Sequence, residues 1–97
     1  MQEGRDKSHF GFLYRIISIH PLYLKPWFDS DEFVDGLLEI EAKGSRFNNH
    51  SVYALMKSVY DQKMMDRANG HNDPTFNFYQ ARRSIHAMEK VLGTQRS

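Results

Sequence analysis

The sequence predicts an all-α fold, a small bundle of three to four helices in one domain. Apolar residues recur at steps of three and four in three stretches, which cover about residues 29–43, 49–68 and 74–92. Each stretch is bounded by residues that start or end helices, and the loops between the stretches are short. Short loops favour helices that pack roughly antiparallel to their neighbours.

The length and composition of the chain fit one small domain with a real core. The chain has 97 residues, of which 40% are hydrophobic and 13% aromatic, so it is not a disordered sequence. We expect the helical domain to cover residues 8–93, between flexible termini at residues 1–7 and 94–97. The chain contains no cysteine, which excludes disulfides and thiolate metal sites and fits a reducing compartment.

The first element, at about residues 8–19, has features of both a helix and a strand. Leu13 and Ile17 fit one face of a helix. Apolar residues on the other side and the adjacent β-branched residues Ile16 and Ile17 make a buried strand the competing interpretation. We prefer a helix that is buried on most sides and that Pro21 ends.

Residues 21–28 read as a connector rather than a long helix. The connector contains two prolines, and Pro26 disfavours helical backbone at Lys25. We expect its large apolar side chains to fill the core from a short turn; they are Leu22, Tyr23, Leu24 and Trp27. An exposed aromatic cluster for a partner is the alternative.

The helix that follows begins with strong local signals. Asp29 and Glu32 have the spacing of a capping box, and Phe28 and Phe33 have that of a hydrophobic staple around it. Gly44 ends the helix. The expected buried stripe consists of Phe33, Leu37 and Ile40. Carboxylates make the remaining surface acidic, at Asp31, Glu32, Asp35, Glu39 and Glu41.

The next helix begins after an asparagine cap, supplied by Asn48 or Asn49. Its expected buried face consists of Val52, Leu55, Met56, Val59 and Tyr60. Lys63 interrupts this face, so we expect the last turns to project into solvent. Met64 and Met65 lie in these turns, where they are either core filler or a pliable contact surface.

The last helix has the clearest periodicity in the chain. Asp73 is the expected N-cap, Pro74 occupies the first helical position, and Gly93 has the place of a C-cap glycine. The expected buried stripe consists of Phe78, Ala81, Ile85, Met88 and Leu92. The opposite side carries what we call the basic face, which consists of Tyr79, Arg82, Arg83, His86 and Lys90.

No motif in the chain points to catalysis or to a bound cofactor. The five histidines include no pair four residues apart and no HExxH, so we expect no metal. Glu39 and Glu41 are two residues apart and point in different directions on a helix, which makes a poor acid–base pair. The chain also lacks a glycine-rich phosphate loop, a nucleophile elbow and a cysteine nucleophile. We therefore expect no cofactor and no enzymatic activity.

The acidic and basic helices predict a protein that binds another protein. We expect a small adaptor, inhibitor or regulator, whose partner-binding residues are Tyr79, Arg82, Arg83, His86, Lys90, Met64 and Met65. A homodimer is also plausible, because the acidic helix of one copy could contact the basic face of another. No run approaches the ~18 apolar residues of a membrane span, and no signal peptide is visible, so we expect a cytoplasmic protein without membrane contact.

The alternative is a nucleic-acid-binding regulator that uses the basic face. The formal net charge is only +1, whereas proteins that coat nucleic acid usually have a strong basic excess. Residues 40–60 resemble a helix-turn-helix only weakly, because Glu41 and Ser45 occupy places that should be apolar or tightly packed. Protein binding is therefore the preferred function.

Overall fold

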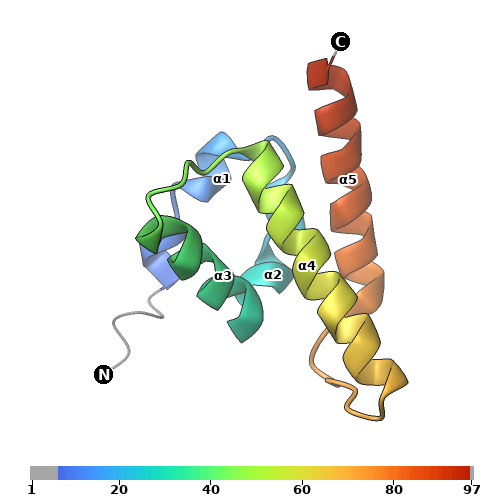
Figure 1. The fold of residues 1–97 in the computed structure, drawn as a ribbon. Helices are drawn as coiled ribbons and strands as arrows, with labels where there is room; N and C mark the ends of the chain where they lie inside the picture. Colours follow the sequence, from blue (N-terminus) through green and yellow to red (C-terminus); the bar gives the residue numbers. More distant parts are fainter. Residues whose placement is uncertain (1–6, 97) are drawn as a thin grey trace.

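Two long antiparallel helices form the frame of the molecule. In the computed structural model, which describes residues 7–96, α4 (Asn49–Ala68) and α5 (Phe78–Arg96) run side by side in opposite directions (Figure 1). The third long helix, α3 (Asp31–Ala42), packs against α4. The predicted antiparallel packing of α4 and α5 is therefore confirmed. Residues 1–6 and 97, which belong to the predicted flexible termini, lie outside the described residues.

Four short elements precede α3 and complete an all-helical fold. They are η2 (Lys7–Phe10), α1 (Leu13–Ile16), η3 (Pro21–Tyr23) and α2 (Lys25–Phe28), where η denotes a 3₁₀ helix. Residues 7–96 contain no strand, which confirms the all-α class and removes the strand alternative for the first element. The single helix that we preferred there is also wrong. The backbone becomes extended at Ile17 (φ −88°, ψ 128°), where two β-branched residues follow each other.

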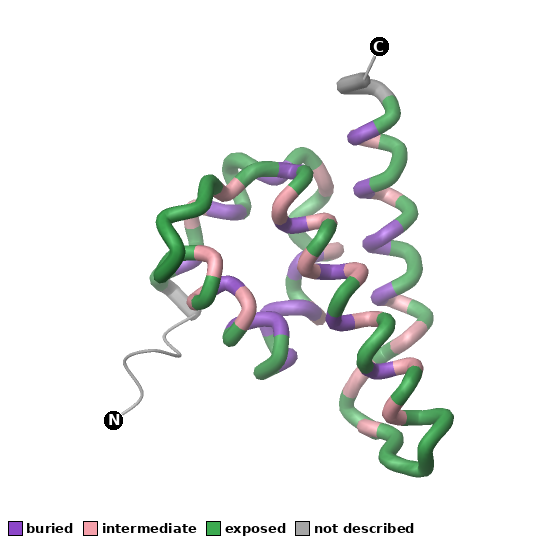
Figure 2. Tube along the Cα trace, viewed as in Figure 1, coloured by how far each residue is buried: buried purple, intermediate pink, exposed green. Residues whose placement is uncertain are grey.

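The core lies where the short N-terminal elements meet the three long helices. Figure 2 shows that buried residues lie along one side of α5 and on the inner sides of α3 and α4. The largest fully buried side chains include Phe10, Trp27, Phe33 and Met88. On α5 the predicted stripe is buried at Ala81, Ile85, Met88 and Leu92, whereas Phe78, which was also predicted, is only half-buried.

The connector fills the core with some of its expected residues but not with all of them. Leu24 and Trp27 are buried, as predicted. Leu22 is 68% exposed, because the 3₁₀ turn of η3 points it outward, and Tyr23 is only half-buried. Lys25 is helical despite the proline after it, since α2 begins at Lys25 and Pro26 falls in its first turn.

Side chains near the start of each long helix accept hydrogen bonds from the first backbone N–H groups. Two of these capping residues differ from the predicted ones. The N-cap of α3 is Ser30 rather than Asp29, and its hydroxyl oxygen accepts from the backbone N–H of Phe33. Asn48 caps α4 in a reciprocal capping box with Ser51. Asn77, not Asp73, accepts from the N–H of Gln80 at the start of α5.

Of the two glycines that we expected to end helices, one does so and the other does not. Gly44 follows α3 with φ +72°, a left-handed conformation that glycine adopts without strain. Gly70 has the same conformation, with φ +83°, in the turn after α4. Gly93 does not end α5, which continues to Arg96. A glycine inside a helix lowers its stability without stopping it.

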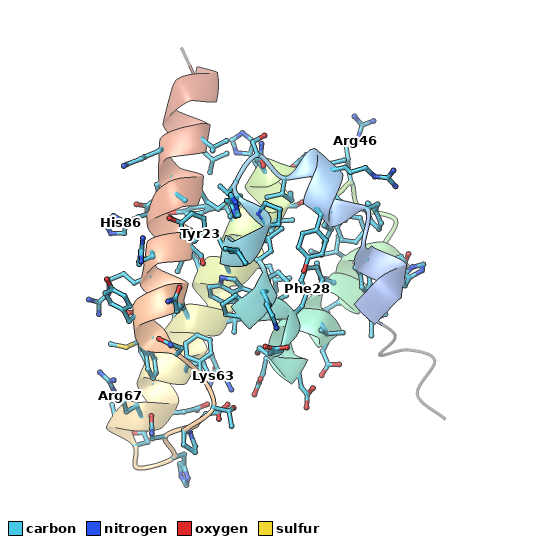
Figure 3. All side chains as sticks on the ribbon, turned by 180° about the vertical axis from the view of Figure 1, so that it is seen from behind. Tyr23, Phe28, Arg46, Lys63, Arg67 and His86 are labelled. Atoms are coloured by element: carbon cyan, nitrogen blue, oxygen red, sulfur yellow. The ribbon has the colours of Figure 1, made fainter. Side chains whose placement is uncertain are left out.

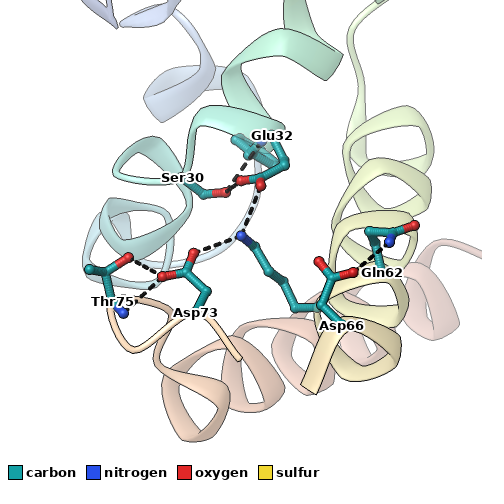
Figure 4. Close-up of polar contacts among 8 residues, drawn as sticks. Ser30, Glu32, Gln62, Asp66, Asp73 and Thr75 are labelled. Carbon is teal, nitrogen blue, oxygen red and sulfur yellow. Dashed lines mark hydrogen bonds and ion pairs between the residues drawn. The ribbon is translucent and has the colours of Figure 1, made fainter. Parts of the chain in front are cut away.

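Lys63 is the largest departure from the sequence-based expectation. Its side chain is only 4% exposed, although we expected this part of α4 to project into solvent. The ammonium nitrogen lies 2.7 Å from Oδ2 of Asp73 and 2.9 Å from Oε2 of Glu32 (Figure 4). Asp73 also accepts hydrogen bonds from the backbone N–H and the hydroxyl of Thr75. Asp73, which we expected to cap α5, therefore ties the segment between α4 and α5 to Lys63 on α4.

The pKa values of these three groups all move in the direction that favours the ion pairs. The hydrogen bond from Lys63, followed by the two hydrogen bonds from Thr75, lowers the pKa of Asp73 from 3.8 to about 2. Burial, the largest single effect, would raise the pKa of Glu32. The hydrogen bonds from Lys63, Ser30 and the backbone, together with the positive charge of Lys63, outweigh burial, so the pKa falls. Burial alone would lower the pKa of Lys63, but its hydrogen bonds with Asp73 and Glu32 raise it overall.

We expect Lys63→Met to destabilise the fold by about 1–2 kcal/mol, because two carboxylates lose the cation that both of them contact. Methionine keeps the length and helix propensity of the side chain, so loss of charge is the main change. Lys43→Met is the matched control. It breaks only an exposed ion pair with Glu39, so we expect a loss of stability below about 0.5 kcal/mol. Urea unfolding of both variants measures the difference, and equal losses would contradict a structural role for Lys63.

The low pKa of Asp73 also predicts an acid-sensitive fold. Because the pKa of Asp73 is lower in the folded state, its contribution to stability is complete above about pH 4 and is lost as the pH falls toward about 2. Asp73→Asn removes this titration but keeps an oxygen that Thr75 can contact. We expect the variant to be less stable than the original protein at neutral pH and to lose less stability on acidification. Urea unfolding midpoints at several pH values test this prediction. The same loss of stability on acidification in both proteins would refute it.

Candidate functional site

The basic face lies on the side of α5 that is opposite its buried stripe. All five of its residues are exposed, and Tyr79 is 65% exposed. They recur at steps of three and four along the helix, so the face follows the helix axis for about three turns. The structure therefore places these five predicted partner-binding residues on one surface.

A shallow depression lies on this surface, between α5 and η3. It has a volume of about 360 Å³, and its lining includes Arg82, Arg83, His86 and Lys90 of the basic face. Tyr23 of η3 and Ala87 form the rest of the lining. In Figure 3, Tyr23 lies next to α5, and His86 projects from the outer side of the same helix. The depression contains no acidic side chain.

A buried hydroxyl joins η3 to α5, the two elements that line the depression. Ser84 is fully buried, and its Oγ donates either to the carbonyl oxygen of Tyr23, at 2.7 Å, or to that of Gln80, at 3.0 Å. The contact with Tyr23 joins two residues that are 61 positions apart in the sequence. It holds the tyrosine against the helix that carries the cations.

Tyrosine side chains contact both guanidinium groups, through their rings at Arg83 and through a hydroxyl at Arg82. The guanidinium carbon of Arg83 lies 5.8 Å from the ring centre of Tyr23 and 5.7 Å from that of Tyr79. Arg82 donates from Nε and Nη2 to the hydroxyl oxygen of Tyr60 on α4, at 3.4 Å for each nitrogen. Within residues 7–96 neither arginine forms an ion pair with a carboxylate. Each guanidinium is positioned, and its charge is not neutralised within the described chain.

Four carboxylates of α3 and α5 form contacts away from the two arginines. Glu89, which is on α5 itself, accepts a hydrogen bond from the hydroxyl of Tyr53 on α4, at 2.8 Å. This bond, together with burial, raises the pKa of Tyr53. On α3, Glu32 pairs with Lys63 and Glu39 with Lys43, and Glu41 lies 2.6 Å from a ring nitrogen of His9. The acidic helix therefore uses these carboxylates for contacts away from the basic face.

The structure does not bring the two methionines into this site. Met64 is half-buried and Met65 is 60% exposed on α4, and neither residue lines the depression. Tyr23 lines the depression, although we preferred to place it in the core; the alternative of an exposed aromatic cluster in residues 21–28 included it. No local pattern decides between these two positions. Its position depends on the contact between η3 and Ser84, which no short-range signal reveals.

Metal sites, membrane-spanning helices and similar proteins are three further sources of functional information about residues 7–96. No group of three or more His, Asp or Glu side chains in this range is arranged to hold a metal ion. None of the helices described combines the length and the apolar character that crossing a bilayer requires. Comparison of the chain with protein-family models, curated proteins and solved structures gives no match.

We expect Ser84→Ala to loosen η3 from α5, because the carbonyl of Tyr23 loses its hydrogen-bond donor. The loss of stability should be about 1 kcal/mol, with faster amide exchange in residues 20–24. Ser58→Ala, an exposed change on α4, should alter stability by less than about 0.5 kcal/mol and leave this exchange unchanged. Unchanged exchange at η3 in the Ser84 variant would show that the hydroxyl does not position Tyr23.

Proposed function

We propose that this chain is a non-enzymatic interaction module that regulates or recruits another protein by binding one of its acidic segments on the basic face of α5. The observation that carries the proposal is the pair Arg82 and Arg83. Both guanidinium groups are exposed and held by aromatic side chains, and neither forms an ion pair with a carboxylate of residues 7–96. An exposed, oriented arginine beside tyrosine rings is the kind of group that dominates binding energy at protein interfaces.

Charge complementarity indicates the chemistry of the partner. The depression is lined by cationic and aromatic groups without a carboxylate, so an acidic segment gains attraction and meets no like charge. The apolar walls from Tyr23 and Ala87 favour a peptide that has an apolar or aromatic residue beside its acids. A segment of this kind is short enough to lie along the exposed turns of α5.

A separate protein is a better candidate than a second copy of this chain. A homodimer of the kind expected from the sequence needs the acidic helix α3 to contact α5 of another copy. The carboxylates of Glu32, Glu39 and Glu41 already contact cations or a histidine within their own chain. Separating Glu32 from the buried Lys63 would cost part of the energy that a dimer would gain, whereas the exposed Glu39–Lys43 pair contributes little.

Selection of short random peptides displayed on phage tests the proposal even though the partner is unidentified. We expect the immobilised protein to enrich acidic sequences, and synthetic peptides of these sequences to bind more weakly as salt is added. Arg82→Glu/Arg83→Glu should reduce their affinity by at least about tenfold, since attraction becomes repulsion at two adjacent positions.

The matched control is Arg15→Glu/Arg46→Glu, which makes the same chemical change at two exposed positions away from α5; Figure 3 shows Arg46. This control should keep the affinity of the original protein within about twofold. Equal losses of affinity in both double variants would show that binding depends only on net charge, and would refute the proposed site. The nucleic-acid alternative would be established by two results together. Mixed-sequence duplex DNA would have to bind more tightly than any selected peptide, and this binding would have to be lost only in the Arg82/Arg83 variant.

A further inference from the structure

We infer that the depression between Tyr23 and α5 is a subsite for a phosphorylated side chain of the acidic partner segment. The inference rests on the proposed function, and it adds the chemical group that the segment presents. The occupant is a phosphomonoester on a serine, threonine or tyrosine of another protein. The partner's phosphorylation state would then control whether it binds to this chain.

Positive charge and hydrogen-bond donors are dense at this depression. Arg82 and Arg83 are adjacent, and His86 lies one helical turn further along the same face. A carboxylate carries one charge and offers two oxygens. A phosphomonoester carries about −1.5 to −2 charges at neutral pH and offers three oxygens. Two adjacent guanidinium groups therefore complement a phosphomonoester more fully than they complement a carboxylate.

The donors are also oriented before a ligand arrives. Arg82 directs Nε and Nη2 at Tyr60, so the N–H groups of Nη1 remain for a ligand. The rings of Tyr23 and Tyr79 flank Arg83 from two elements of the fold and restrict its movement. A guanidinium that is already restrained loses less conformational entropy when it binds an oxyanion. The rigid fork of an arginine also matches phosphate oxygens two at a time.

The cationic surface is limited in extent, which favours a single phosphate over a nucleic-acid backbone. The lining cations gather at one depression of about 360 Å³, and Glu89 lies next to Lys90 on the same helix. Nucleic acid presents phosphates at regular intervals along an extended backbone, and a protein that binds it needs cations along that whole length. The cations at this depression are enough for one or two anionic groups, and the net charge of the chain is only +1. This distribution fits a phosphopeptide better than a duplex.

The test compares three synthetic peptides that differ at one position. A phosphoserine, a glutamate or an unmodified serine is placed between flanking glutamates, and affinities are measured by isothermal titration calorimetry. We expect the phosphoserine peptide to bind at least about tenfold more tightly than the glutamate peptide, and the serine peptide to bind most weakly. Amide resonances of Arg82, Arg83 and His86 should shift on binding, as followed by NMR.

Arg82→Lys/Arg83→Lys separates the geometry of the site from its charge. This variant keeps both positive charges but loses the planar donor forks, so the preference for phosphoserine over glutamate should fall to about twofold or less. Binding of the glutamate peptide should remain. Tyr23→Leu should weaken phosphoserine binding in the same direction, because Arg83 loses one of its flanking rings. NMR spectra of both variants verify that they are folded.

The outcomes distinguish this inference from the proposed function. Glutamate and phosphoserine peptides that bind equally would overturn the phosphate subsite and leave the acidic-segment proposal in place. No binding of either peptide would overturn both. Inorganic phosphate that displaces the phosphopeptide at equal concentration would show a free-ion site rather than a peptide site. Duplex DNA that displaces the phosphopeptide at lower concentration would identify nucleic acid as the occupant, and either displacement refutes the inference.

Discussion

The ammonium group of Lys63 is the interaction on which the arrangement of the long helices depends. It joins α4, which carries it, to Glu32 at the start of α3 and to Asp73 in the connection that leads to α5. A buried lysine is costly unless its charge is compensated, and here two carboxylates compensate it. The cost of separating either carboxylate from the cation restrains both neighbouring segments. The path from α4 to α5 is thus fixed before α5 begins.

This restraint explains why the candidate site lies where it does. Since Asp73 is held by Lys63 and Thr75, the chain makes a further turn and α5 begins only after Asn77. The helix then returns along α4 with its apolar stripe inward, which leaves the opposite side exposed. Tyr60 of α4 and Tyr23 of η3 each contact one of the two adjacent arginines. A basic helix surface is common, but one with guanidinium groups positioned by two other elements is more selective.

The distribution of charge also separates structural from functional residues. Three carboxylates of α3 act within the fold, through Lys63, Lys43 and His9. The arginines of α5 have aromatic neighbours instead of carboxylates, so they keep their capacity to bind an external anion. A protein with a net charge of only +1 can still present one local site for an acidic group, since these negative charges are bound elsewhere.

The sequence by itself determined the helical class, the bounds of α4, four of the five residues in the buried stripe of α5 and the residues of the basic face. These features follow from apolar periodicity and from capping side chains, which act over three to four residues. Tertiary structure alone decided the burial of Lys63, the use of Ser30 and Asn77 as caps, and the place of Tyr23. Each depends on a partner that is distant in sequence or on competition between neighbouring polar side chains. Local spacing describes a helix face, whereas the residues that position its arginines become neighbours only when the chain folds.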